Sequence, residues 1–184
     1  GQGTQVLNID WGVFVFTPSI TPDPNAGAIT PLPQVLPTSF TNLPKLDPKG
    51  AEVTTQIISK TFMKATYTGN HMDSFGGVAY GYDNPDTTTK ETLNLNTLFP
   101  GGNLVFQLDG TGLTQVGFEV MDSNGKVFKA NITNIAVTGQ KYKVALSQLL
   151  EAIDPTKVTQ ISFVFTGQGT QVLNIDWGVF VFTP

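Results

Sequence analysis

The chain has 184 residues, 40% hydrophobic and 13% charged, a composition that predicts one folded domain because disordered chains combine low hydrophobicity with high charge. Its net charge of −4 and lack of arginine argue against nucleic-acid binding, which needs basic side chains to neutralise phosphates. The absence of cysteine excludes disulfides and thiolate chemistry, and no apolar run approaches the roughly 20 residues of a membrane span.

The first 18 residues of the chain are repeated at its end. Residues 1–18 and 167–184 both read GQGTQVLNIDWGVFVFTP, at an offset of 166 residues. Such a repeat indicates a 166-residue unit in tandem, cut so that the tail of one unit precedes the next. The alternatives are an engineered duplication of a terminal strand and a donor strand that completes a neighbour. All three make the repeated segment a β-strand of this domain.

The repeated segment has the pattern of a strand that must be covered on both sides. In the C-terminal copy, Leu173 and Ile175 alternate with Asn174 before a continuous apolar run. An N-terminal copy left in water would be a template for aggregation, so we expect it to pair with another sheet. Its apolar residues are the candidate assembly residues: Val6, Leu7, Ile9, Trp11, Val13, Phe14, Val15 and Phe16.

Residues 19–50 are predicted to form an extended linker. Residues 18–48 hold eight of the 12 prolines, and proline fixes φ and donates no backbone hydrogen bond. A semi-rigid spacer and an ordinary disordered linker are both compatible with this composition. The predicted organisation is therefore an extra β-strand at 1–18, a Pro-rich linker at 19–50 and a β domain at 51–184.

The rest of the chain reads as short strands separated by turns. The expected strands are residues 53–58, 61–68, 76–82, 91–98, 103–108, 114–121, 126–132, 141–146, 158–165 and 170–182. A strong hairpin signal lies at 122–125, and the one expected helix is 147–153, with Ser147 as its N-cap. Many strands and one helical turn predict an all-β fold, an antiparallel β-sandwich of jelly-roll type.

Five apolar runs carry a family resemblance. They are NLVFQLDG from Asn103, FEVMDSNGKV from Phe118, QKYKVALSQLL from Gln140, KVTQISFVF from Lys157 and VLNIDWGVFVF from Val172. In this order they resemble the second half of the galactose-binding-like jelly-roll domains, a group that contains many carbohydrate-binding modules of polysaccharide-degrading enzymes. The resemblance covers about residues 103–182 and implies a non-catalytic jelly roll that binds carbohydrate.

The same resemblance implies a structural calcium ion, because these modules often hold one near the closing strand. Asp176 stands where the group places an acidic ligand, although Trp177 follows it where a second acidic or amide residue is common. Asp83 and Asp86 are weaker candidates in an oxygen-rich loop, and the hairpin residue Asp122 is another. Solvated turns, and capping of the hairpin's own backbone by Asp122, are the alternatives for these last three acids.

Sugar binding would need aromatic faces for stacking, with amides and carboxylates for the hydroxyl groups. The candidate aromatic residues are Tyr80, Tyr82, Tyr142 and Trp177. Burial in the core is the alternative, since Trp177 shares the face of Leu173 in an alternating strand.

We expect no enzymatic activity. The nucleophile-elbow pattern is absent, and the one histidine, His71, lies in a turn-like run with no evident partner. Glycoside hydrolysis needs two carboxylates close in space, which sequence spacing does not show.

The repeat favours assembly over a binding pocket. The expected function is a non-catalytic structural or adhesive repeat that joins copies of itself head to tail, by β-strand addition, into fibres or tandem arrays. The alternative is a calcium-stabilised carbohydrate-binding module whose partner is a polysaccharide. Few charges and no cysteine suit an extracellular or cell-surface location, and we expect a prokaryotic source.

Overall fold

The computed structural model describes residues 19–23, 39–42, 51–58, 62–82, 91–95 and 102–183; residues 39–42, 62, 105 and 176–183 are described by their backbone alone. Several predictions fall outside these residues. They are the assembly residues Val6, Leu7, Ile9, Trp11, Val13, Phe14, Val15 and Phe16, the acids Asp83 and Asp86, and the side chains of Asp176 and Trp177.

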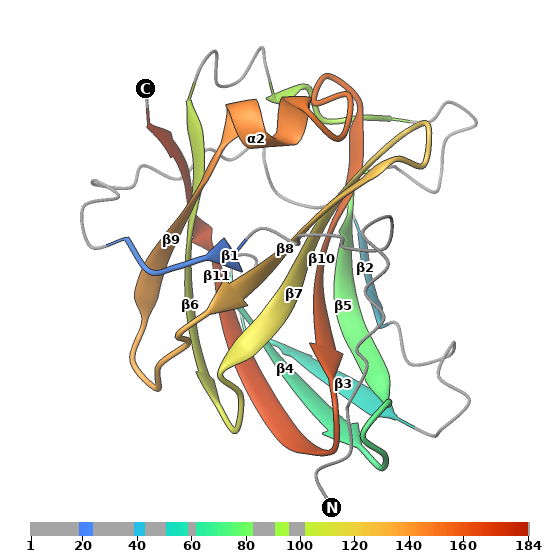
Figure 1. The fold of residues 1–184 in the computed structure, drawn as a ribbon, viewed down its shortest axis with the longest axis vertical. Coiled ribbons are helices and arrows are strands. Elements are labelled where there is room, and N and C mark those ends of the chain that lie inside the picture. The colour runs from blue at the N-terminus through green and yellow to red at the C-terminus, as the bar shows by residue number, and fades with distance from the viewer. Residues whose placement is uncertain are drawn as a thin grey trace, which may run out of the picture.

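Two β-sheets form the two layers of the fold (Figure 1). The six-stranded sheet has the order β1 (Ser19–Ile20), β8 (Val127–Thr133), β7 (Gln115–Asp122), β10 (Val158–Thr166), β5 (Phe75–Gly81) and β2 (Ser39–Asn42). The five-stranded sheet has the order β3 (Glu52–Ile57), β4 (Phe62–Gly69), β11 (Gly169–Thr183), β6 (Asn103–Thr111) and β9 (Gln140–Ala145). All neighbours are antiparallel except β1 and β8. The predicted all-β jelly-roll sandwich is confirmed.

The alternation of side chains along each strand decides which face enters the core. On β7, Val116, Phe118 and Val120 are buried, while Gln115 and Glu119 lie on the outer face. The hairpin to β8 turns where the sequence signal predicts it, because Gly125 adopts a φ of 78° that other residues rarely reach. Local patterning therefore sets the register of this pair.

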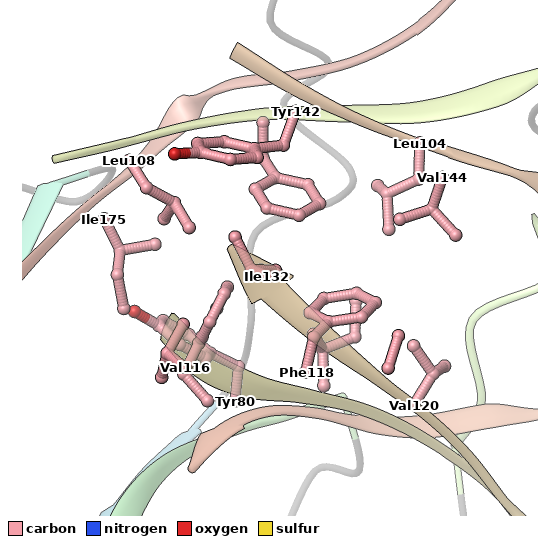
Figure 2. Close-up of a cluster of buried hydrophobic side chains, with 14 of the residues drawn as sticks. Tyr80, Leu104, Leu108, Val116, Phe118, Val120, Ile132, Tyr142, Val144 and Ile175 are labelled. Atoms are coloured by element: carbon pink, nitrogen blue, oxygen red, sulfur yellow. The ribbon is translucent and has the colours of Figure 1, made fainter. Parts of the chain in front are cut away.

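The core between the sheets is rich in aromatic rings (Figure 2). The Phe106 ring stacks on Phe118 with centroids 5.3 Å apart and on Tyr142 at 6.0 Å, and Phe163 lies 5.6 Å from Phe118. Figure 2 shows Tyr142 from β9 on the layer opposite Phe118 from β7. Of these contacts, the stacking of Phe106 on Phe118 joins the two sheets, and it adds to the burial of apolar area.

The prediction of a linker over 19–50 is wrong in two places. β1 pairs with β8, and β2 pairs with β5 at the opposite edge of the six-stranded sheet. Ile20 is buried in the core, and the Asp23 carboxylate lies 2.9 Å from Lys143 Nζ. The sandwich therefore includes β1 and β2, which precede residue 51, because one apolar side chain between prolines is enough to dock the chain at β1.

Two local predictions also differ from the structure. Residues 91–95 make a single isolated bridge, between Leu93 and Val158, instead of the start of a strand over 91–98. The helix α2 (Leu146–Leu150) has Ala145 as its N-cap, whose N–H donates to Gln148 Oε1 at 3.1 Å. Ser147 therefore lies inside the helix and does not cap it.

β11 occupies the centre of the five-stranded sheet, between β4 and β6. Gly167 and Gly169 adopt φ values of 93° and 104° in the turn that leads from β10 in one sheet to β11 in the other. The Tyr67 hydroxyl donates to the Gly167 carbonyl at 2.6 Å, which fixes this turn on β4. Leu173 and Ile175 are fully buried, so β11 is a core strand.

Candidate functional site

The three candidate tyrosines belong to the core. Tyr80 and Tyr142 are 0% exposed and Tyr82 is 6% exposed, so none of them presents a ring to a sugar. The prediction that they stack on carbohydrate is wrong, and the alternative of burial is correct. Their strands alternate as expected, but alternation alone does not tell which of the two faces meets the opposing sheet.

Asp122 serves the backbone of its own hairpin. Its Oδ1 accepts the N–H groups of Asn124 at 2.8 Å and Lys126 at 3.0 Å, and its Oδ2 accepts the N–H of Asp154 at 2.9 Å. Burial raises the pKa of Asp122, but these three backbone donors outweigh it and hold the pKa below its ordinary value. Both carboxylate oxygens are therefore engaged, which makes this residue a poor calcium ligand.

No group of three acidic, histidine or cysteine side chains suited to a metal ion occurs among the residues whose positions are described. The calcium prediction thus rests on Asp176, Asp83 and Asp86, whose side chains lie outside them, and it stays a prediction.

A shallow hollow lies on the outer face of the six-stranded sheet, over β8, β7 and β10, which run side by side in Figure 1. Its volume is about 210 Å³. The described residues that line it are Gln115, Val116, Gly117, Glu119, Lys129, Ala130, Asn131, Val164 and Thr166. It is smaller than the roughly 300–1,000 Å³ of enclosed small-molecule pockets, so it suits one group of a larger ligand.

The hollow exists because a glycine stands in the middle strand. Gly117 pairs with Asn131 of β8 on one side and with Val164 of β10 on the other. A Cβ at Gly117 would lie 3.2 Å from Val164 Cβ and 3.3 Å from the Val164 carbonyl oxygen, so the neighbours are already closely packed there. Because Gly117 has no side chain, the surface of the sheet is depressed there between the side chains of β8 and β10.

Several kinds of polar residue line this hollow. Glu119 Oε1 lies 2.8 Å from Lys129 Nζ, across a register pair of β7 and β8. The amides of Gln115 and Asn131 and the hydroxyl of Thr166 line the same hollow. Carboxylate, ammonium, amide and hydroxyl groups together can both donate to and accept from the hydroxyls of a polyol.

An aromatic ring lies next to the hollow. Phe75 stands directly opposite Thr166 in the pairing of β5 with β10, and its side chain is 36% exposed. A ring in this position offers an apolar face beside the polar floor. Sequence analysis missed Phe75 because the order β7-β10-β5 joins segments far apart in the chain. It also missed the Glu119–Lys129 pair, although the predicted hairpin at 122–125 brings these two residues opposite each other.

Comparison with known proteins identifies the fold but no family. No protein-family profile matches the sequence, and no curated protein matches it either. Among solved structures, a family 11 carbohydrate-binding module from Clostridium thermocellum, in complex with a beta-1,3-1,4-mixed-linked tetrasaccharide, is similar with a TM-score of 0.51 and 15% identity. The match covers 82% of this chain and 97% of that one.

Two agarases contain a similar domain. An exo-beta-agarase matches with a TM-score of 0.53 and 16% identity over 82% of this chain, and the agarase AgWH50C with 0.53 and 12% over 78%. This chain spans only 24% and 25% of those two proteins. These similarities confirm the carbohydrate-binding-module-like jelly roll that the sequence resemblance implies.

No helix in the described segments has the length and hydrophobicity needed to cross a bilayer.

Proposed function

We propose that this protein is a non-catalytic carbohydrate-binding module that holds a polysaccharide on the outer face of its six-stranded sheet. The observation that carries the proposal is the Gly117 hollow, where Glu119, Lys129, Asn131 and Gln115 meet on a fold shared with a sugar-binding module. An extracellular location follows from this proposal, because polysaccharides of the kinds bound or cleaved by the similar proteins lie outside cells.

The chemistry of the hollow suits a sugar better than a charged ligand. The Glu119–Lys129 pair is neutral overall, and both side chains are at least partly exposed. Such a surface pair contributes little to stability, roughly 0–1 kcal/mol, so it can exchange its contact for hydrogen bonds to hydroxyl groups. Phe75 provides the apolar surface against which the C–H face of a sugar ring can pack.

The hollow does not favour hydrolysis. Glu119 is the single carboxylate among its described lining residues, and it is already paired with a cation at 2.8 Å. Glycoside hydrolysis uses two carboxyl groups about 5–9.5 Å apart across the scissile bond. The proposed module therefore binds its polysaccharide and leaves it intact.

Affinity electrophoresis in gels that contain mixed-linkage β-glucan or agarose tests the proposal. We expect retardation of the wild-type protein in at least one of these gels. The variants Glu119→Gln and Asn131→Ala should each weaken binding about 5- to 10-fold, since each removes about 1 kcal/mol of hydrogen bonding. Phe75→Ala should weaken it by a similar factor.

Thr66→Ala is the matched control, because Thr66 lies on β4 in the other sheet. It should bind like the wild type. Equal retardation of the wild type and all three hollow variants would place any sugar binding elsewhere. Release of reducing sugar from either polysaccharide would contradict the non-catalytic part of the proposal.

A second candidate function, assembly into fibres or tandem arrays, is favoured by one specific observation, the exact repeat of residues 1–18 at 167–184. It does not exclude the first, since a sheet face and a strand can act independently. The way in which the repeat could link copies is developed below.

A further inference from the structure

The repeated sequence has a defined place in the fold. Its C-terminal copy supplies β11, and β11 runs through the middle of the five-stranded sheet. There Leu173 and Ile175 enter the core, the Gln171 amide donates to the Thr166 carbonyl at 2.8 Å, and Asn174 Nδ2 donates to Asp109 Oδ1 at 2.5 Å. We call the space between β4 and β6 that this strand fills the β11 slot.

The repeat includes the whole of this structural element. The copy starts at Gly167, directly after the last residue of β10, and it ends one residue after the end of β11. Residues 1–18 therefore contain every residue that the slot receives, turn glycines included. Leu7, Asn8 and Ile9 correspond to Leu173, Asn174 and Ile175.

The N-terminal copy cannot fill the β11 slot of its own domain while β1 is in place. In that slot Thr17 would take the position of Thr183, which pairs with Asn103 in the five-stranded sheet. Ser19 pairs with Asn131 in the other sheet, and packed sheets lie about 10 Å apart. Two residues further along a chain can be at most about 7 Å away. Figure 1 also shows the C-terminal end of β11 well apart from β1.

Each chain thus carries one β11 slot and two sequences that fit it. Because the resident strand fills the slot of the described domain, the complementary surface for the second sequence lies in another copy of the domain. We propose that residues 1–18 act as β11 of a second copy of this chain, entering the middle of its five-stranded sheet in the register of residues 167–184. This inference differs from strand addition at a sheet edge, because the donated strand replaces a core strand.

Replacement of a core strand has a definite consequence for assembly. The donor surface is the N-terminus of one copy and the acceptor is the β4–β6 space of the next, so the contact is head to tail and does not close on itself. The strand of the acceptor must leave the slot when the donor enters. Exchange is therefore favoured when the acceptor's own β11 is weakened.

The repeat allows the same substitution to be made in the donor and in the resident strand of the full-length chain. Leu173→Asp places a carboxylate in the core and impairs the resident β11, whereas Leu7→Asp impairs only the donor. Mass by light scattering and thermal unfolding by circular dichroism are followed for each variant and for the double variant over a range of protein concentrations.

We expect Leu7→Asp to be monomeric with a wild-type melting temperature. Leu173→Asp should stay folded by taking the N-terminal strand of another copy, so its mass should at least double and rise with concentration, as should its melting temperature. The double variant has no intact strand for the slot and should melt lower than Leu173→Asp. The proposal would be overturned if Leu173→Asp had the same melting temperature as the double variant. It would also be overturned if Leu173→Asp were folded and monomeric.

Cysteine cross-linking checks the register, because the wild-type chain contains no cysteine. In the Leu173→Asp background, Asn8→Cys with Asp109→Cys should form a disulfide-linked ladder, since the corresponding Asn174 is the register partner of Asp109. Asn8→Cys with Asn103→Cys is the control, because Asn103, at the start of β6, lies about 20 Å from Asp109 along the strand. Equal ladders from both pairs would show random collision and contradict the proposed register. These measurements need no sugar. A negative result would therefore leave the proposed carbohydrate binding intact, and a failure of carbohydrate binding would leave the strand exchange intact.

Discussion

At the scale of single residues, Asp122 is the buried charge that organises one end of the sandwich. It is 1% exposed, and its three backbone donors come from the hairpin between β7 and β8 and from the segment after α2. A buried carboxylate is tolerated only where hydrogen bonds replace its water. Asp122 therefore links two loops, which the Ser123 N–H also joins by donating to the Lys157 carbonyl at 2.9 Å.

Asp122 makes stability depend on pH in a definite direction. Since its folded-state pKa lies below the ordinary value, its contribution is complete above about pH 4 and is lost as the pH falls through the folded-state pKa. Asp122→Asn should lower the free energy of unfolding by about 1.5–3 kcal/mol at pH 7 and flatten the decline in acid. Urea unfolding at pH 7, 5 and 3 measures both effects.

The exposed Asp73 provides the control, and Asp73→Asn should change the free energy of unfolding at pH 7 by no more than about 0.5 kcal/mol. Asp154 contributes to the decline as well, because hydrogen bonds from the Thr156 side chain and backbone hold its pKa below the ordinary value. An unaltered pH profile in Asp122→Asn would show that Asp122 does not govern acid stability.

The tyrosine hydroxyls of the core differ in their partners. Tyr82 Oη is buried without a hydrogen-bond partner in the described structure, and burial raises its pKa. The Tyr142 hydroxyl lies 3.2 Å from Gln140 Oε1 and 3.4 Å from the Asn134 carbonyl, and burial raises its pKa to about 12. The buried Tyr82 hydroxyl therefore lowers stability, whereas hydrogen bonds compensate the burial of the Tyr142 hydroxyl.

Replacing each tyrosine by phenylalanine should give opposite results. Tyr82→Phe removes an unsatisfied buried group and should leave the melting temperature unchanged or raise it, whereas Tyr142→Phe should lower stability by about 1 kcal/mol. Differential scanning calorimetry of the two variants and the wild type measures these changes in melting temperature and stability. Equal destabilisation by both would mean that Tyr82 has a partner of its own.

At the scale of elements, the edge strand β1 decides where the domain begins. Ile20 is buried against the core, and β1 runs parallel to β8, which would otherwise be a sheet edge. Pro22 bridges to Tyr142 of β9, so this short segment touches both sheets. The prolines around it restrict the chain before it docks, which reduces the entropy lost on docking.

Ile20→Asp should destabilise the protein by about 3 kcal/mol, because it buries an unpaired charge at the sheet edge. Ser19→Ala, at the exposed neighbouring position, should change stability by no more than about 0.5 kcal/mol. Urea unfolding of the two variants gives both values. A loss below about 1 kcal/mol for Ile20→Asp would show that β1 is dispensable and that the domain starts later.

The strands themselves could be predicted because their signals are local. The predicted segments 114–121 and 126–132 become β7 (Gln115–Asp122) and β8 (Val127–Thr133), since alternation and the turn at 122–125 set both ends. The docking of β1 could not be predicted, because its signal is the single residue Ile20 in a proline-rich run. The same holds for 91–98, where alternation suggested a strand that the described residues 91–95 do not form.

At the scale of the whole molecule, the candidate site could not be predicted from the sequence because its residues come from four strands. Glu119 and Lys129 come from neighbouring strands, but Thr166 and Phe75 join them only through the sheet order β7-β10-β5. Aromatic residues were the natural candidates in the sequence, yet the three candidate tyrosines, Tyr80, Tyr82 and Tyr142, fill the space between the sheets. The resemblance pointed to the correct fold, and the site residue it implied, Asp176, stays a prediction.

Pro18 is the single residue between residues 3–17, which correspond to β11, and β1. If each such segment were seated in a neighbour, adjacent domains would be held a few ångströms apart, with no flexible tether between them. Their Gly117 hollows would then recur at a fixed spacing along one assembly. A long glycan with a matching period could engage several hollows at once, and weak attachment at each would add up to strong avidity through a high effective concentration.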